Sequence, residues 1–290
     1  VMTKNPISII ESELFDEFLE IKLNQKLIKK FSPEKRYTKY LPVIDKDGIL
    51  KDILTYEELI DLRRSNIGLI SVWGLGFVGI TLLAAIGSKG FKVIGIDKSE
   101  SLIKDLRKNK LHVHEPGLKE SLQLSKANKL IDFSVEPLKA KNSNIHIICV
   151  GTPVDKNMNH NLTSIKKVSE SISSILKKDD LVLIRSTVPI GTTRKTIIPI
   201  LEQSNLKVND DFHVAFTPER TIEGNALEEI FNIPQIIGGY SQNCLEKAEL
   251  FWQNITSTTV STSNLEAAEM TKLLNNSYRD LTFGFSNAFI

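Results

Sequence analysis

The chain has 290 residues, of which 41% are hydrophobic and 25% are charged, as is usual for folded globular proteins. A formal charge of +2, without a long block of like charge, gives no electrostatic reason to expect nucleic acid or an anionic membrane as a partner. We therefore expect a small-molecule ligand.

The predictions of localisation and metal content rest on what the sequence lacks. No apolar run approaches the roughly 18 to 20 residues that span a bilayer, and no basic-then-apolar signal segment is found at the N-terminus. The two cysteines, Cys149 and Cys244, are too few for a disulfide framework and lack the spacing of zinc ligands. We expect a cytoplasmic protein with reduced thiols and without a metal site. Because the sequence begins with valine, we also expect residues upstream of it.

The first 64 residues are expected to form a small α+β module. A strand is predicted at Ile7–Ile10, a helix at Glu11–Phe31, and a strand that enters a tight turn at Leu41–Gly48. The pair Asp47-Gly48 between apolar runs predicts a β-hairpin. The short polar stretch Arg63–Asn66 marks the boundary of this module.

Residues 66–262 alternate between short β-rich apolar runs and longer amphipathic stretches. The predicted strands lie at Gly68–Trp73, Phe91–Ile96, Ile145–Val150, Leu181–Arg185 and His213–Phe216. The predicted helices lie at Phe77–Ser88, Ser99–Lys108, Ser164–Lys177 and Thr192–Gln203. This alternation predicts an α/β domain with a doubly wound parallel sheet that helices cover on both faces.

Residues 263–290 are predicted to begin a long central helix. Asn264 is a candidate N-cap, and no Gly or Pro follows it until Gly284.

A glycine motif, Gly74-Leu75-Gly76-Phe77-Val78-Gly79, follows the first strand of the α/β domain and opens its first helix. Gly74 permits a tight turn, Gly76 lets the backbone approach a pyrophosphate, and Gly79 lets helix and strand pack closely. The N–H groups at the start of the helix are then available to phosphate. The motif is typical of a Rossmann-type dinucleotide-binding domain.

A carboxylate at the end of the next strand defines the expected cofactor. Asp97 lies about twenty residues after the glycine motif, where an acid accepts hydrogen bonds from the adenosine ribose. Because a 2′-phosphate would be repelled there, NAD is favoured over NADP. The alternative is a doubly wound domain whose glycine turn binds nothing or a different nucleotide.

Several further motifs occur in an order and spacing that resemble the UDP-glucose/GDP-mannose dehydrogenase family over about residues 67–290. They are His114-Glu-Pro-Gly-Leu118, Val150-Gly-Thr-Pro153, Arg185-Ser-Thr-Val-Pro-Ile-Gly191, Phe216-Thr-Pro-Glu-Arg220 with Glu223-Gly224, Ile236-Ile-Gly-Gly239 and Glu269-Met-Thr-Lys-Leu-Leu-Asn-Asn276. The resemblance implies NAD-dependent oxidation of the C6 hydroxyl of a UDP-sugar to a uronate for polysaccharide biosynthesis, in two successive oxidations.

Two threonines in these motifs are candidate cofactor residues. Thr152 follows the carboxyl end of a buried strand, where ligands collect in open α/β sheets, so its hydroxyl is available to the cofactor unless the tetrapeptide is only a turn. The resemblance implies that Thr187 positions the cofactor or a catalytic water. The segment His114–Leu118 is expected to be a loop with a solvated His and Glu that carry no chemistry. The other histidines are expected to be surface or satisfied core residues.

Three polar residues are candidate catalytic groups. Glu219 follows Pro218, which fixes the local backbone, and the resemblance implies that its carboxylate handles water during hydrolysis of a covalent intermediate. An ion pair with Arg220 or another base is the structural alternative. Lys272 and Asn276 share one helix face and can supply donors to a developing oxyanion; the resemblance implies that both are catalytic.

The resemblance also implies a cysteine nucleophile downstream of the Lys/Asn helix, followed by a sugar-nucleotide-binding domain. Cys149 lies in a predicted buried strand and Cys244 in a predicted helix, so both are expected to be small buried hydrophobes. We therefore expect a fragment that binds NAD without completing the oxidation.

Three segments of the N-terminal module, at Val1–Ile9, Leu41–Gly48 and Ile53–Leu59, together resemble a CBS domain. The resemblance implies a regulatory unit that binds an adenine nucleotide. Asp52 stands where that family usually has glycine, and Glu58 where it has a ribose-binding aspartate, so a purely structural or dimerising module is the alternative.

Three functional hypotheses follow. The first is a homodimeric nucleotide-sugar 6-dehydrogenase. The segment Thr217–Leu227 followed by Ile233–Gly239 resembles enzymes that act on UDP-N-acetylhexosamines more than those that act on UDP-glucose. The second is a two-electron β-hydroxyacid dehydrogenase, which needs no cysteine. The third is a non-catalytic sensor that combines a CBS module with an NAD-binding domain.

Overall fold

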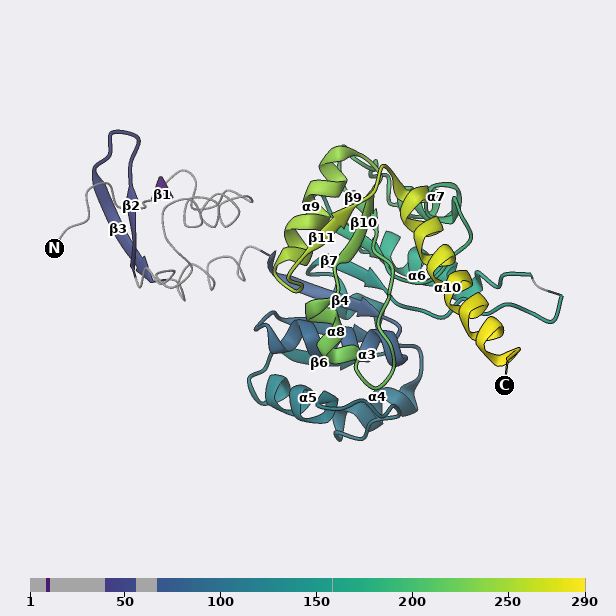
Figure 1. Cartoon of the computed structure of the whole chain (residues 1–290). Helices are drawn as coiled ribbons and strands as arrows, with labels where there is room; N and C mark the ends of the chain where they lie inside the picture. Colours follow the sequence, from purple (N-terminus) through teal and green to yellow (C-terminus); the bar gives the residue numbers. More distant parts are fainter. Residues whose placement is uncertain (1–8, 11–39, 56–66, 158, 290) are drawn as a thin grey trace. The chain divides into compact units, whose positions relative to one another are not determined.

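The computed structural model describes residues 9–10, 40–55, 67–157 and 159–289, and it divides the chain into two units, residues 1–67 and 68–290 (Figure 1). In the described part of the chain, no helix is long and apolar enough to cross a membrane.

The described part of the first unit is a three-stranded sheet. Strand β1 (Ile9–Ile10) pairs in parallel with β2 (Tyr40–Ile44), which pairs antiparallel with β3 (Leu50–Thr55). The Asp45 carboxylate accepts the N–H groups of residues 47 and 49, and Gly48 has φ +81°, so the predicted hairpin is confirmed.

Two predictions for this unit lie outside the described residues. These are the helix at Glu11–Phe31 and the nucleotide contact at Glu58. The resemblance to a CBS domain and its adenine nucleotide therefore stay predictions.

The second unit is built on one eight-stranded sheet. Its strands are β4 (Leu69–Trp73), β5 (Val93–Ile96), β6 (Ile131–Ser134), β7 (Ser143–Ile148), β8 (Leu181–Ile184), β9 (His213–Phe216), β10 (Gln235–Gly239) and β11 (Thr259–Ser261). Their order across the sheet is β11-β10-β9-β8-β7-β4-β5-β6. The six strands from β6 to β9 are parallel; β10 is antiparallel to β9, and β11 is parallel to β10. The predicted α/β class with a Rossmann-type parallel sheet is confirmed, with a reversed pair of strands at one edge.

The helices of this unit lie between and after the strands. They are α3 (Phe77–Ser88), α4 (Glu100–Arg107), α5 (Leu118–Ala127), α6 (Thr163–Ser173), α7 (Ile198–Leu201), α8 (Ala226–Asn232), α9 (Gln242–Gln253) and α10 (Leu265–Asn287). Short 3₁₀ turns occur at Pro137–Ala140 and Glu202–Ser204, and a π-helical turn, Thr193–Ile197, leads into α7. The predicted N-cap of α10 is confirmed, because the Asn264 side chain accepts the N–H of Ala267 at 2.8 Å.

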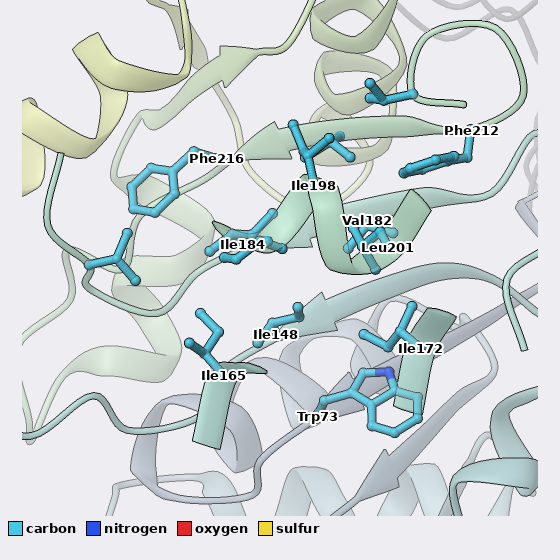
Figure 2. Packing of buried hydrophobic residues seen from close by; sticks show 14 of the residues in the cluster. Trp73, Ile148, Ile165, Ile172, Val182, Ile184, Ile198, Leu201, Phe212 and Phe216 are labelled. Carbon is cyan, nitrogen blue, oxygen red and sulfur yellow. The ribbon is translucent and has the colours of Figure 1, made fainter. Parts of the chain in front are cut away.

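One face of the sheet carries a large apolar core. Strand residues such as Trp73, Ile148 and Ile184 pack against Ile165 and Ile172 of α6 (Figure 2). Residues of α7 and the first turn of α10 complete this core. Helices α3 and α9 pack against the other side of the sheet, so helices cover both faces as expected.

Two histidines are buried within this unit. His146 is fully buried, and its Nδ1 lies 2.8 Å from the Ser71 hydroxyl. His213 is 3% exposed, and its Nδ1 lies 3.7 Å from the Cys244 sulfur. Burial lowers the pKa of His213 to about 4, and the nearby charge of Lys247 acts in the same direction. Both rings are therefore neutral in the folded protein at neutral pH.

The depressed pKa of His213 predicts a loss of stability in acid. Below about pH 6.5 the unfolded chain binds a proton on this ring, whereas the folded protein does so only near pH 4, so stability falls as the pH decreases across this range. We expect His213→Gln to reduce the fall in unfolding free energy between pH 7 and pH 5 by about 2 kcal/mol, measured by urea denaturation. An unchanged pH dependence in the variant would contradict this assignment.

Candidate active site

The glycine turn after β4 has the shape that a pyrophosphate requires. Gly74 has φ +90°, and a Cβ at Gly79 would lie 1.8 Å from the Gly74 carbonyl oxygen, so neither position tolerates a side chain. A Cβ at Gly76 would meet open space, which leaves the backbone accessible to a ligand. Phe77 and Val78 form the first turn of α3, where backbone N–H groups lack partners within the helix. The turn therefore fits a dinucleotide phosphate.

Asp97 connects the end of β5 to this turn. One carboxylate oxygen accepts the N–H of Leu75 at 2.8 Å, and the other accepts the N–H of Ser99 at 3.0 Å. The carboxylate is thus fixed in orientation, and each oxygen keeps acceptor capacity for a ribose hydroxyl. The sequence predicted only the ribose contact.

A cleft of about 470 Å³ lies at the glycine turn. It is lined by Trp73, Gly74, Gly76, Ile96, Asp97, Lys98, Val135, Pro137, Cys149, Val150, Gly151, Thr163, Ser164, Lys167, Val168 and Ser171. Its size suits part of a dinucleotide.

The two candidate threonines lie beside each other at the ends of β7 and β8. The Thr152 hydroxyl donates to the Thr187 carbonyl oxygen. The Ser186 hydroxyl donates to the Val150 carbonyl oxygen at 2.7 Å, so the two strand ends are tied together. Because the Thr152 proton is already donated, this hydroxyl can only accept a hydrogen bond from a cofactor in this arrangement.

Glu219 lies just after β9 in a buried ion pair. Its Oε2 accepts from Arg185 Nε at 2.9 Å and lies 2.6 Å from the second guanidinium nitrogen. Its Oε1 accepts the backbone N–H groups of Arg220 and Thr221. Four donors therefore fill the roughly four acceptor positions of the carboxylate. The partner is Arg185 and not the neighbouring Arg220.

Arg185 is itself held from several sides. Its guanidinium donates to the Gln235 side-chain oxygen at 2.8 Å and to the Thr217 carbonyl oxygen at 3.3 Å, and it lies 4.8 Å from the Trp252 ring centre. Burial by itself would raise the pKa of Glu219, but the Arg185 charge and the hydrogen bonds from Thr221 and Arg185 outweigh it and lower the pKa. Glu219 is therefore ionised at neutral pH.

Two carboxylates dock α10 on the domain. Glu269 is fully buried and accepts the N–H groups of Gly191 and Thr193, at the start of the π-helical turn. Glu266 binds Arg194, with Nε to Oε1 at 2.6 Å. These contacts fix the first half of the helix that carries Lys272.

Lys272 and Asn276 are half-buried and one turn apart on α10, so they share a face as predicted. Burial lowers the pKa of Lys272, the charge of Glu219 offsets part of this effect, and the charges of Arg279, Arg185 and Arg220 add to it. Lys272 therefore lies close enough to Glu219 for the carboxylate charge to influence its pKa.

The expectation for the loop at His114–Leu118 is wrong for its glutamate. His114 is exposed, but Glu115 is 5% exposed and accepts the N–H groups of Gly224 at 2.8 Å and Leu227 at 3.3 Å. The carboxylate thereby fixes the far end of the segment that begins at Glu219. A buried carboxylate needs such donors, because desolvation without them is costly.

The comparison with known proteins now decides the family. Residues 68–256, more than half of the chain, match the model described as UDP-glucose/GDP-mannose dehydrogenase family, NAD binding domain. The chain belongs to this family. The matched domain is its NAD-binding domain, so the cofactor is NAD, and the glycine turn and Asp97 fit it.

Relatives in this family act on nucleotide sugars. The UDP-N-acetyl-D-mannosamine dehydrogenase of Pyrococcus horikoshii is 34% identical over 224 residues, which cover 76% of this chain and 52% of the relative. The UDP-N-acetyl-D-glucosamine 6-dehydrogenase of Pseudomonas aeruginosa is 34% identical over 223 residues, covering 75% and 51%. The chain spans about half the length of the curated relatives it matches.

Solved structures agree with this assignment. The P. horikoshii UDP-D-ManNAc dehydrogenase superposes with a TM-score of 0.73 at 30% identity, covering 76% of this chain and 53% of that one. The GDP-mannose dehydrogenase of P. aeruginosa gives 0.71 at 30% identity, covering 75% and 51%.

The buried ion pair predicts a large stability effect. Arg185→Met leaves the Glu219 charge without its partner, and we expect a loss of about 3–5 kcal/mol in unfolding free energy, measured by urea denaturation at pH 7. The double variant Arg185→Met/Glu219→Gln removes both charges and should recover part of this loss. If the losses in unfolding free energy of Arg185→Met and of Glu219→Gln, each measured alone, simply added in the double variant, the two side chains would not be coupled.

Proposed function

We propose that this chain is the cofactor-binding part of an NAD-dependent dehydrogenase that oxidises the C6 hydroxyl of a UDP-N-acetylhexosamine to the uronate for polysaccharide biosynthesis. The observation that carries the proposal is the glycine turn, whose shape fits NAD, in a domain where the Glu219 charge also influences the pKa of Lys272 on α10. The choice of sugar is supported by the names of relatives in P. horikoshii, Campylobacter jejuni and P. aeruginosa. UDP-glucose is the alternative sugar.

The roles of the α10 residues follow from their donors. NAD, when bound, accepts the hydride of the alcohol. In this proposal the Asn276 amide donates a hydrogen bond to the substrate oxygen as negative charge develops on it. Lys272, whose pKa is lowered, accepts the hydroxyl proton as the neutral amine and then donates to the same oxygen as the ammonium. Thr187 lies at the β8 end of the same edge, in position to orient the cofactor or a water.

Glu219 acts in this proposal mainly as a fixed negative charge. Its four filled acceptor positions hold it in place, and its charge opposes the deprotonation of Lys272 that burial favours. The role in handling water that the resemblance implies requires that one of these hydrogen bonds be given up.

The second oxidation needs a thiolate that neither cysteine offers. Burial raises the pKa of Cys149 to about 12. The Arg185 charge lowers this pKa, and the Glu219 charge raises it by a smaller amount. Cys244 is fully buried in α9 against His213, at the amino end of β9. We therefore propose that residues 1–290 by themselves bind NAD and do not form the carboxylate.

The stoichiometry of NADH tests this function. The protein translated from the whole reading frame that contains this sequence should form two NADH per UDP-N-acetylhexosamine, followed by absorbance at 340 nm, whereas the 290-residue chain should form no uronate. One NADH per substrate would favour the β-hydroxyacid alternative. A stop codon directly after that of Ile290 would instead favour the non-catalytic sensor.

We also propose that α10 pairs with a second copy of this chain. Met270, Leu274, Tyr278, Leu281 and Phe285 are 47–75% exposed. At about 100° per residue they fall on one stripe of the helix, on the side opposite Lys272 and Asn276. An exposed apolar stripe of this length on a 23-residue helix is typical of a contact surface. Dimerisation through it leaves the catalytic face open.

Light scattering on the purified 290-residue chain tests this pairing. We expect the dimer mass for the wild type and the monomer mass for Leu274→Asp/Leu281→Asp, because burying two carboxylates opposes association. Asn275→Asp, which adds a charge outside the stripe, should leave the dimer intact. A monomeric wild type would refute the proposal.

A further inference from the structure

The NAD cleft has a wall that the glycine motif does not predict. Helix α6 contributes Thr163, Ser164, Lys167, Val168 and Ser171 to the lining of the cleft. The glycine turn and Asp97 line the same cleft. A ligand held by the glycine turn therefore also faces α6.

The sequence of α6 separates this wall from the core. Ile165 and Ile172 lie on the buried side of the helix and pack against the sheet (Figure 2). The cleft-lining residues recur at spacings of three and four and form a second face. Both Lys166 and Lys167 are exposed, but only Lys167 lines the cleft.

The charged groups of the cleft leave an excess of positive charge. They are Asp97, Lys98 and Lys167. Both oxygens of the one carboxylate already accept N–H groups. Within the residues that the structure describes, no carboxylate lies within 4.0 Å of the Lys167 ammonium. The net positive charge of the cleft lining therefore favours an anionic ligand.

The cofactor supplies such an anion. Its pyrophosphate carries two negative charges, and the glycine turn offers only neutral N–H groups to it. The ammonium group of a lysine in the cleft lining can supply the positive charge that the turn lacks. Charge-assisted hydrogen bonds of this kind are about twice as strong as neutral ones.

We propose that Lys167 is a cofactor-binding residue whose ammonium contacts a phosphate group of NAD. The inference concerns the cofactor alone and does not depend on which sugar is oxidised. It adds α6 to the glycine turn and Asp97 as a third part of the NAD site.

Calorimetric titration of NAD into the 290-residue chain tests the contact. At low ionic strength we expect Lys167→Ala to bind NAD about tenfold more weakly than the wild type and Lys167→Arg to keep most of the affinity. The difference should shrink at about 1 M salt, where the Debye length is only about 3 Å. Lys166→Ala is the matched control and should bind as the wild type does. Circular dichroism checks that each variant is folded.

Cofactor fragments locate the contact. Lys167→Ala should weaken the affinity for ADP-ribose by the same factor as that for NAD and leave the affinity for adenosine unchanged. If the affinity for AMP also falls, Lys167 contacts the phosphate nearest the adenosine. If the affinity for AMP does not change, Lys167 contacts the other phosphate. Equal NAD affinity in wild type and Lys167→Ala overturns the proposal, and so does an equal loss in Lys166→Ala or for adenosine. If the wild type fails to bind NAD while remaining folded, the NAD site itself fails, and the proposal fails with it.

Discussion

The guanidinium of Arg185 is buried at the carboxyl edge of the sheet and joins the segments that surround the candidate catalytic residue Glu219. It follows β8, pairs with Glu219 after β9, reaches Gln235 at the start of β10, and lies against Trp252 of α9. A buried charge of this kind is tolerated only when its partners are complete, so the arrangement of these strand ends is fixed together. The charge of the ionised Glu219 raises the pKa of Lys272 on α10, and the charge of Arg185 lowers it.

The cofactor end of the site and the end that holds Glu219 and Lys272 are shaped by different physical features. The cofactor end depends on the absence of side chains: a Cβ at Gly79 would collide with the Gly74 carbonyl, and Gly76 faces open space. The end of the site that holds the candidate catalytic residues depends on buried carboxylates, because Glu269 docks α10 and Glu115 holds the segment that begins at Glu219. Loss of a glycine should therefore affect cofactor binding, whereas loss of a carboxylate should move the candidate catalytic residues.

The sequence was sufficient for the features that local rules determine. The glycine motif predicted the turn and the bounds of α3, and Asn264 predicted the start of α10. Three strands were missed for physical reasons: β6 is short and carries Asp132, β10 ends in two glycines that pack against neighbouring backbone, and β11 has only three residues. The partners of the site residues could not be predicted either, since Arg185 meets Glu219 across 34 positions and Glu115 meets Gly224 across 109. Such pairings depend on the order of the strands in the sheet.

The most direct test of this account is a crystal structure of the 290-residue chain with NADH. We expect the pyrophosphate at the N–H groups that follow Gly76, the adenosine ribose at Asp97, and the nicotinamide at the edge that carries Thr187 and Lys272. A dinucleotide bound in the opposite direction, or away from the glycine turn, would contradict the account.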